Sequence, residues 1–164
     1  MTTSALVSLS NSRKMLGNPY LKVQVHPQSF AALAMPFVQE ALVLPIRQLT
    51  PMPNKPPCLL GLTNRRSRVL WVVDLAQLLG LGALPVNVQQ HNIIIVQVGN
   101  MPLGLAVEQV EGIVWLTREM IQLPPAQITP RLLPFLQGCW VQPDELTFLL
   151  DVAAIARSQL LHAD

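Results

Sequence analysis

The chain has 164 residues, of which 51% are hydrophobic and 12% are charged, and its net charge is +2. This length fits one large domain or two small ones, and the low charged fraction leaves apolar surface for contacts with other molecules. The longest apolar stretch, residues 69–86, is interrupted by Asp74, Gln77, two glycines and a proline, so it predicts no membrane span. The N-terminus does not resemble a signal peptide, because Arg13 and Lys14 follow its weakly apolar part.

Short apolar runs separated by prolines follow one another along the chain. Runs rich in β-branched and aromatic residues predict strands, and proline-rich segments predict loops or sheet edges. The pattern therefore predicts an all-β fold. The main runs are YLKVQV at 20–25, RVLWVV at 68–73, NIIIVQV at 92–98 and LTFLL at 146–150, and the proline-rich segments are 51–57 and 123–130.

Two short helices are predicted, each directly after a strand. Asp74 is the expected N-cap of the first, which ends before Gly80, and Asp151 is the expected N-cap of a longer one towards the C-terminus. A role for Asp74 and Asp151 as a catalytic acid and base has less support than a role as helix caps.

Three segments of the first half recur in the same order in the second half. Residues 22–25 match 95–98, residues 33–45 match 105–117, and residues 59–79 match 136–156. In the third match Gly61 corresponds to Gly138 and Asp74 corresponds to Asp151. Collinear matches of this kind indicate two copies of one small β unit.

The two copies differ in charge. Residues 1–82 hold eight basic and two acidic residues, whereas residues 83–164 hold three basic and seven acidic residues. The basic sequence NRRSR at 64–68 corresponds to VQPDE at 141–145. Such an inversion between halves is a signal about association with other molecules.

The chain shows no residue pattern typical of catalysis or of metal binding. His26, His91 and His162 are far apart and lie in no nucleophile motif, and there is no phosphate-binding loop. Cys58 and Cys139 have no metal or redox spacing, so we expect buried free thiols in a reducing compartment. We therefore expect no enzymatic activity, no cofactor and no metal.

Nucleic-acid binding is an alternative function for the arginines at 65, 66 and 68. A cluster of this kind on a small β-barrel could contact phosphates. However, aromatic residues for base stacking make up only 5% of the chain, and the second half is acidic. A small nucleic-acid-binding β-barrel module using Arg65–Arg68 stays open as the alternative.

Four segments match family motifs in the right order. They are FVQEALVLP at 37–45, LTPMPNKPPCLLG at 49–61, GLTNRRSRVLWVVDL at 61–75 and MPLGLAVEQVEGIV at 101–114. The third resembles the signature GxxNLRGxxxPVxDL, and the first contains a VxEV-like segment. Together, over residues 18–160, they resemble the CheW-like proteins, the scaffold adaptors of bacterial chemosensory arrays.

The resemblance implies a fold of two similar five-stranded β-barrels, SH3-like or OB-like, with a short helix after the last strand of each copy. We place the first barrel at residues 18–83 and the second, with a C-terminal helix, at 84–164, after a flexible tail at 1–17. Some strand is expected to cross between the barrels.

The resemblance also implies a non-enzymatic cytoplasmic adaptor, recruited to membrane-associated receptor arrays. Its partners would be the cytoplasmic tips of methyl-accepting chemoreceptors and the regulatory domain of a CheA-type histidine kinase. The output would be chemotaxis, phototaxis or twitching motility, and NRRSRV with WVVDLA points to the pilus branch. The regulatory domain of a larger kinase is disfavoured, because nothing resembles a kinase ATP site.

A partner-binding site on the first barrel follows from the same resemblance. Gly61, Asn64 and Arg66 match residues of the signature, and Glu40 matches the Glu of VxEV, so we expect an ion pair between Glu40 and Arg66. Ser67 replaces a signature glycine, which puts the loop conformation in question. The inverted charges of the two copies also favour weak self-association. The expected partner-binding residues are Val38, Glu40, Gly61, Asn64, Arg65, Arg66, Ser67, Arg68 and Val69.

Overall fold

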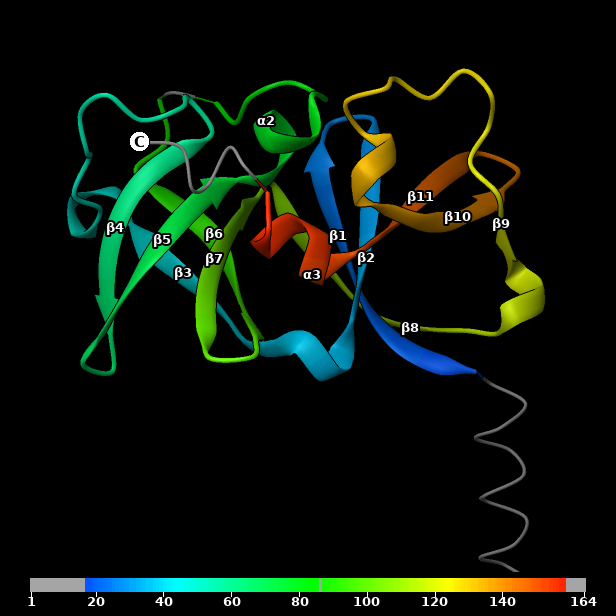
Figure 1. Cartoon of the computed structure of the whole chain (residues 1–164), viewed down its shortest axis with the longest axis horizontal. Helices are drawn as coiled ribbons and strands as arrows, with labels where there is room; N and C mark the ends of the chain where they lie inside the picture. The colour runs from blue at the N-terminus through cyan, green and yellow to red at the C-terminus, as the bar shows by residue number, and fades with distance from the viewer. Residues whose placement is uncertain (1–16, 86, 159–164) are drawn as a thin grey trace, which may run out of the picture.

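The computed structural model describes residues 17–85 and 87–158, and the all-β prediction is confirmed. Figure 1 shows two β-sheets side by side, with the helices α2 (Leu75–Leu79) and α3 (Val152–Ala156) between them. Four 3-10 turns complete the elements: η1 (Met35–Phe37), η2 (Ile46–Gln48), η3 (Arg118–Met120) and η4 (Leu133–Phe135). Among the described residues, no helix is both long and apolar enough to cross a bilayer.

Five strands of each sheet follow matching orders, and sheet A has a sixth strand, β9, at its edge, where the sequence predicted five. Sheet A runs β8-β1-β2-β11-β10-β9 and sheet B runs β3-β6-β7-β5-β4. Sheet A contains β1 (Asn18–His26), β2 (Ser29–Ala34), β8 (Gln109–Leu116), β9 (Ile121–Gln122), β10 (Leu136–Gln142) and β11 (Glu145–Leu150). Sheet B contains β3 (Val38–Pro45), β4 (Leu59–Arg65), β5 (Arg68–Asp74), β6 (Gln90–Val98) and β7 (Met101–Val107).

Each sheet takes its first hairpin from the other copy of the repeat. The hairpin β1–β2 pairs with β8 and β11 of the second copy, and β6–β7 pairs with β3 and β5 of the first. A boundary near residue 83 therefore separates the two copies along the chain but does not separate the two sheets. Of the tail expected at 1–17, all but residue 17 lies outside the described residues.

The capping role of the two aspartates is confirmed. The carboxylate of Asp74 accepts a hydrogen bond from the backbone N–H of Gln77 at 3.2 Å, and that of Asp151 accepts one from Ala154 at 3.0 Å. The prediction of a longer C-terminal helix is wrong over the described residues: α3 ends at Ala156, where Arg157 is its C-cap, and it has the same five residues' length as α2. Residues 159–164 lie outside the described part of the chain.

Gly61 and Gly138 also occupy equivalent places, each at a β-bulge where a neighbouring segment comes close. A Cβ atom on Gly61 would lie 2.5 Å from the carbonyl oxygen of Thr50, and one on Gly138 would lie 3.0 Å from that of Gln122. A side chain at Gly61 would push the neighbouring backbone away, and one at Gly138 would clash first with the side chain of Ile121, at 2.6 Å.

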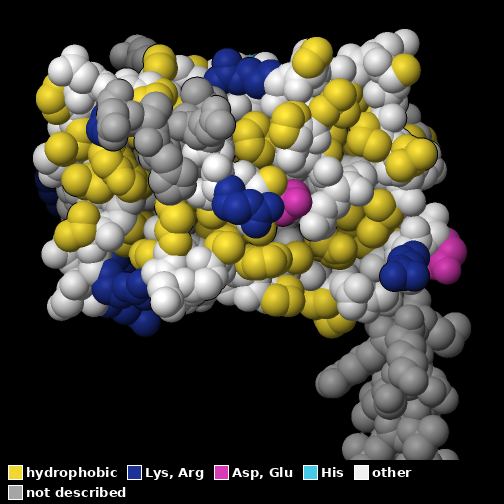
Figure 2. All heavy atoms as spheres, in the orientation of Figure 1, with side chains coloured by type: hydrophobic (Ala, Val, Ile, Leu, Met, Phe, Trp, Pro, Cys, Tyr) yellow, Lys and Arg dark blue, Asp and Glu magenta, His cyan; other side chains and the backbone are white. Residues whose placement is uncertain are grey.

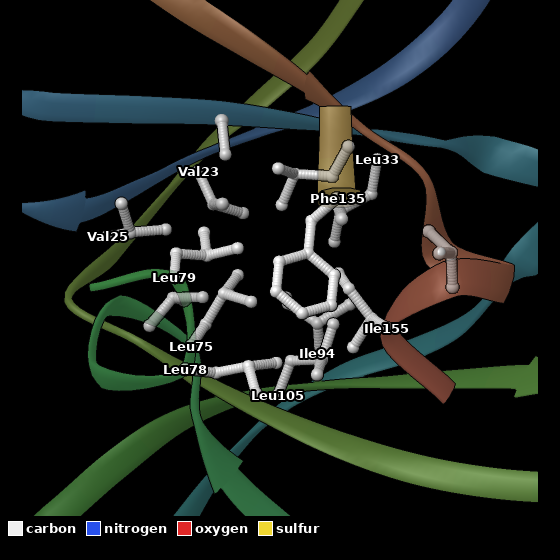
Figure 3. Close-up of a cluster of buried hydrophobic side chains, with 14 of the residues drawn as sticks. Val23, Val25, Leu33, Leu75, Leu78, Leu79, Ile94, Leu105, Phe135 and Ile155 are labelled. Carbon is white, nitrogen blue, oxygen red and sulfur yellow. The ribbon is translucent and has the colours of Figure 1, made fainter. Parts of the chain in front are cut away.

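A shared apolar cluster fills the space between the two sheets and explains the uninterrupted apolar run of β6. Ile94 points into this cluster, whereas Ile93 and Ile95 point into the interior of sheet B. Cys58 and Cys139 are free and buried in the shared cluster, and burial raises the pKa of both thiols. Figure 3 shows ten labelled members from both sheets, both helices and η4: Val23, Val25, Leu33, Leu75, Leu78, Leu79, Ile94, Leu105, Phe135 and Ile155.

We predict that Asp74→Ala destabilises the fold more than Asp151→Ala. Besides capping its helix, Asp74 accepts a hydrogen bond from the backbone N–H of Leu84 at 2.9 Å, and its side chain is buried. Loss of a cap costs about 1 kcal/mol, and a buried N–H without a partner costs about 1–3 kcal/mol more. Urea unfolding of the two variants measures the difference, and equal losses would contradict this account of Asp74.

Candidate functional site

A depression of about 390 Å³ lies at one end of sheet B and takes residues from all five of its strands. Its apolar floor includes Leu70 and Ile95, which are 4% and 5% exposed, and arginines form its rim. Figure 2 shows basic side chains gathered at the lower left, near the tips of the β4–β5 and β6–β7 hairpins. We call this depression the sheet B mouth. It is lined by Gln39, Glu40, Arg65, Arg66, Arg68, Leu70, Ile95 and Pro102.

A two-pronged ion pair spans this mouth. Arg65 Nε donates to Glu40 Oε1 at 2.9 Å, and Arg65 Nη2 donates to Glu40 Oε2 at 3.0 Å. These hydrogen bonds hold the pKa of the Glu40 carboxyl below its usual value and raise the pKa of Arg65. β3 and β4 are the two edge strands of sheet B and are not paired with each other by backbone hydrogen bonds. The ion pair between Glu40 and Arg65 therefore joins these two edges through side chains.

The predicted ion pair between Glu40 and Arg66 is present but is the weaker of two. Arg66 Nη2 lies 3.6 Å from Glu40 Oε2, and 77% of the Arg66 side chain is exposed. Arg65 is the closer partner, although the signature drew attention to Arg66. The arginine held by the fold and the arginine presented to solvent are therefore adjacent residues with different roles.

Arg68 is held by the β6–β7 turn rather than by an acid. It donates to Gln97 Oε1 and to the carbonyl oxygen of Asn100, both at 3.3 Å. Gln97 also accepts from Gln39 at 2.6 Å and donates to the carbonyl oxygen of Gly99 at 2.9 Å. Sequence reasoning missed Gln97, since a neutral residue in a strand carries no charge signal.

The β4–β5 hairpin turns through two residues with left-handed backbone conformations. Arg66 has φ of 53° and Ser67 has φ of 65°, between the paired residues Arg65 and Arg68. Positive φ at both central positions is the geometry of a type I′ turn, which usually takes Asn or Gly. Ser67 therefore keeps the conformation expected of the signature glycine, with some backbone strain.

The remaining predicted site residues do not line the sheet B mouth. Val38 packs against the shared apolar cluster, and Gly61 lies at its bulge. Asn64 and Val69 pair with each other, so their side chains point to the opposite face of the hairpin from Arg65 and Arg68. The structure thus brings together Glu40, Arg65, Arg66 and Arg68 of the predicted set, with Ser67 in the turn.

The charge inversion between the copies falls on equivalent hairpins. In β10–β11, Gln142 pairs with Glu145 as Arg65 pairs with Arg68 in β4–β5, and Asp144 lies exposed in the turn. Glu145 makes an ion pair with Lys22 of β1. Part of the acidic character expected at this end of the molecule is therefore neutralised within the chain.

Comparison with known proteins assigns the family. The model of the CheW-like domain matches residues 19–160. The chain belongs to the CheW-like domain family. A "Probable chemotaxis protein CheW" of Rhizobium etli is 33% identical over 106 residues, which cover 65% of this chain and 68% of that protein. A "Chemotaxis protein CheW" of Rhizobium meliloti is 40% identical over 76 residues, which cover 46% of this chain and 48% of that protein.

The fold agrees with a solved member of this family. The crystal structure of the scaffolding protein TtCheW from Thermoanaerobacter tengcongensis matches with a TM-score of 0.70 at 21% identity, over 82% of this chain and 89% of that chain. The CheW-like prediction and the predicted fold of two small SH3-like barrels are confirmed.

We predict that Arg65→Ala lowers the thermal midpoint more than Arg66→Ala, because Arg65 makes the closer pair with Glu40. Exchanging the charges, as Glu40→Arg with Arg65→Glu, should recover part of the loss. Because the pKa of Glu40 is lowered in the folded state, the pair stabilises the fold fully above the usual carboxyl pKa of 4.5. The difference between wild type and Arg65→Ala should therefore shrink below that pH and be lost as the pH falls through the lowered pKa of Glu40. Strictly additive effects in the double-mutant cycle would argue against the pairing.

We predict that Ser67→Gly stabilises the protein by about 1 kcal/mol, because glycine adopts the left-handed conformation without strain. Ser67→Val is the matched control and should destabilise, since a β-branched residue is disfavoured at positive φ. Chemical unfolding of both variants gives the comparison. A Ser67→Gly variant no more stable than wild type would show that the turn is unstrained.

Proposed function

We propose that this chain is a non-enzymatic cytoplasmic adaptor that couples methyl-accepting chemoreceptors to a CheA-type histidine kinase in a chemosensory array. Membership of the CheW-like family and the names of the curated relatives support a role in chemotaxis signalling. The observation that carries the proposal to particular residues is the sheet B mouth. It combines an apolar floor with a basic rim on a scaffold that ion pairs and hydrogen bonds hold in place.

The division of labour among the arginines suggests how a partner would bind. Arg65 is neutralised by Glu40, whereas Arg66 is mostly exposed and makes only the long contact to the same carboxylate. A carboxylate on a partner can therefore pair with Arg66 without breaking the clamp between β3 and β4. Charged rims of this kind mainly set orientation and association rate, while apolar contacts provide burial.

The acidic face at the β10–β11 hairpin supports a polarity of assembly. Asp144 is exposed where the first copy presents the basic turn, so the two ends of the molecule favour partners of opposite charge. The regulatory domain of the kinase is the proposed partner at the sheet B mouth. Weak head-to-tail self-association of the chain would follow the same polarity.

The nucleic-acid alternative finds little support at this site. The residues that line the sheet B mouth include no aromatic side chain on which a base could stack. Trp71 packs against the shared apolar cluster, and Trp140 packs within sheet A. Glu40 places a negative charge among the arginines that would contact phosphates.

We predict that Arg66→Glu with Arg68→Glu weakens binding to the kinase regulatory domain at least tenfold, while the thermal midpoint falls less than in Arg65→Ala because the hydrogen bonds lost with Arg68 are exposed. Arg65 is left intact because it clamps the barrel. The measurement is a titration of wild type and variant against that domain at low and high salt, where salt should slow association more than it speeds dissociation.

The matched control for this titration is Asp144→Arg, an exposed change at the equivalent turn of the second copy. It should not abolish the contact made through the sheet B mouth. Equal, salt-independent affinities for wild type and the Arg66/Arg68 variant would show that these arginines only face solvent and do not contact the partner. That result would contradict the proposed docking site.

A further inference from the structure

The end of sheet A that corresponds to the sheet B mouth has a lysine in its floor. Lys22 of β1 pairs with Gly112 of β8, and Ile95 of β6 pairs with Glu40 of β3. Gly112 and Glu40 are equivalent positions in the matched segments 105–117 and 33–45. Lys22 therefore takes the place that Ile95 holds in the sheet B mouth. A position that is apolar in one copy carries an ammonium group in the other.

Three groups surround this ammonium. Lys22 Nζ lies 4.9 Å from the centroid of the Phe30 ring and 5.6 Å from that of the Trp140 ring, and it pairs with the carboxylate of Glu145. Only 14% of the Lys22 side chain is exposed. Two aromatic faces and one carboxylate are the groups that bind organic ammonium ions in proteins, since ring and acid both attract a cation.

A buried hydroxyl lies beside the same two rings. Thr147 is paired in register with Phe30 on one side and with Trp140 on the other, and it is 0% exposed. Its Oγ1 atom has no hydrogen-bond partner among the described residues. The interior of sheet A thus holds an unused acceptor close to the aromatic pair, as a site for a donor group would.

We propose that this end of sheet A is an ammonium-binding site that the chain occupies with its own Lys22. We call it the sheet A mouth, formed by Phe30, Trp140 and Glu145 around Lys22, with Thr147 beside the two rings. The chain's own lysine thereby closes the sheet A mouth to a partner's basic side chain, while the sheet B mouth keeps its volume of about 390 Å³. The proposal concerns recognition within this chain, and its test does not depend on the adaptor function.

The test replaces Lys22 with alanine and adds propylammonium, which has the atoms that the substitution removes. Lys22→Ala keeps Cβ, so propylammonium replaces the lost atoms. The thermal midpoint of Lys22→Ala should rise with propylammonium chloride beyond the rise in sodium chloride of equal ionic strength. At a concentration of ten times Kd, the ratio of folded to unfolded protein should increase about elevenfold. Wild type, whose site is occupied, should not respond.

Matched controls separate ammonium recognition from the filling of a hole. Ile95→Ala empties the equivalent place in sheet B, which arginines surround, and should gain nothing from propylammonium. Neutral 1-propanol should not replace propylammonium in Lys22→Ala, and adding Glu145→Gln should weaken the response. Equal responses of wild type and Lys22→Ala, or equal effects of propanol and propylammonium, would overturn the proposal.

A second measurement keeps the proposal testable if Lys22→Ala does not fold. Acetylation of Lys22 in the native protein, followed by mass spectrometry, reports how firmly the amine is held. Glu145→Gln should raise the acetylation rate of Lys22 several-fold by removing the carboxylate. An unchanged rate would show that Glu145 does not hold the lysine in the site.

Discussion

The two copies of the repeat exchange hairpins, and this exchange determines how both sheets and the apolar cluster between them form. Sheet A is completed by β1–β2 from the first copy, and sheet B is completed by β6–β7 from the second. In this structure neither sheet is built from the strands of one copy alone. The shared apolar cluster follows from this arrangement, because the exchanged strands carry apolar residues towards the other sheet as well as into their own.

The same exchange brings together the residues of both copies that hold the sheet B mouth in place. The arginines come from β4 and β5 of the first copy, but Gln97 and Asn100 of the second copy hold Arg68. Glu40 on β3 then joins the opposite edge through Arg65. A partner that contacts this rim meets a surface assembled from both halves of the chain, so local changes in either half can alter its geometry.

Much of the fold was predictable because the duplication leaves collinear sequence matches between the two halves of the chain. The paired aspartates cap equivalent helices, and the paired glycines sit at equivalent bulges, since each position has a local physical requirement. The exchange of hairpins could not be predicted in detail, because the apolar patterns of β1 and β6 are the same whichever copy these strands pair with. The sequence also did not indicate that Arg65, and not Arg66, makes the closer ion pair with Glu40. This depends on a two-residue turn with positive φ at Arg66 and Ser67. Lys22 gave no sign of its role, because its partners Phe30, Trp140 and Glu145 are distant in the chain.

If the exchanged hairpins make the chain one cooperative unit, the two sheets must unfold together. Trp71 reports on sheet B and Trp140 on sheet A, so each can serve as the single fluorophore after the other tryptophans, including Trp115, are replaced by phenylalanine. Urea unfolding of each single-tryptophan protein is followed by fluorescence and, in the same protein, by far-UV circular dichroism. In both proteins the fluorescence transition should coincide with the circular dichroism transition. Two separate transitions, with one sheet melting while the other persists, would contradict the account.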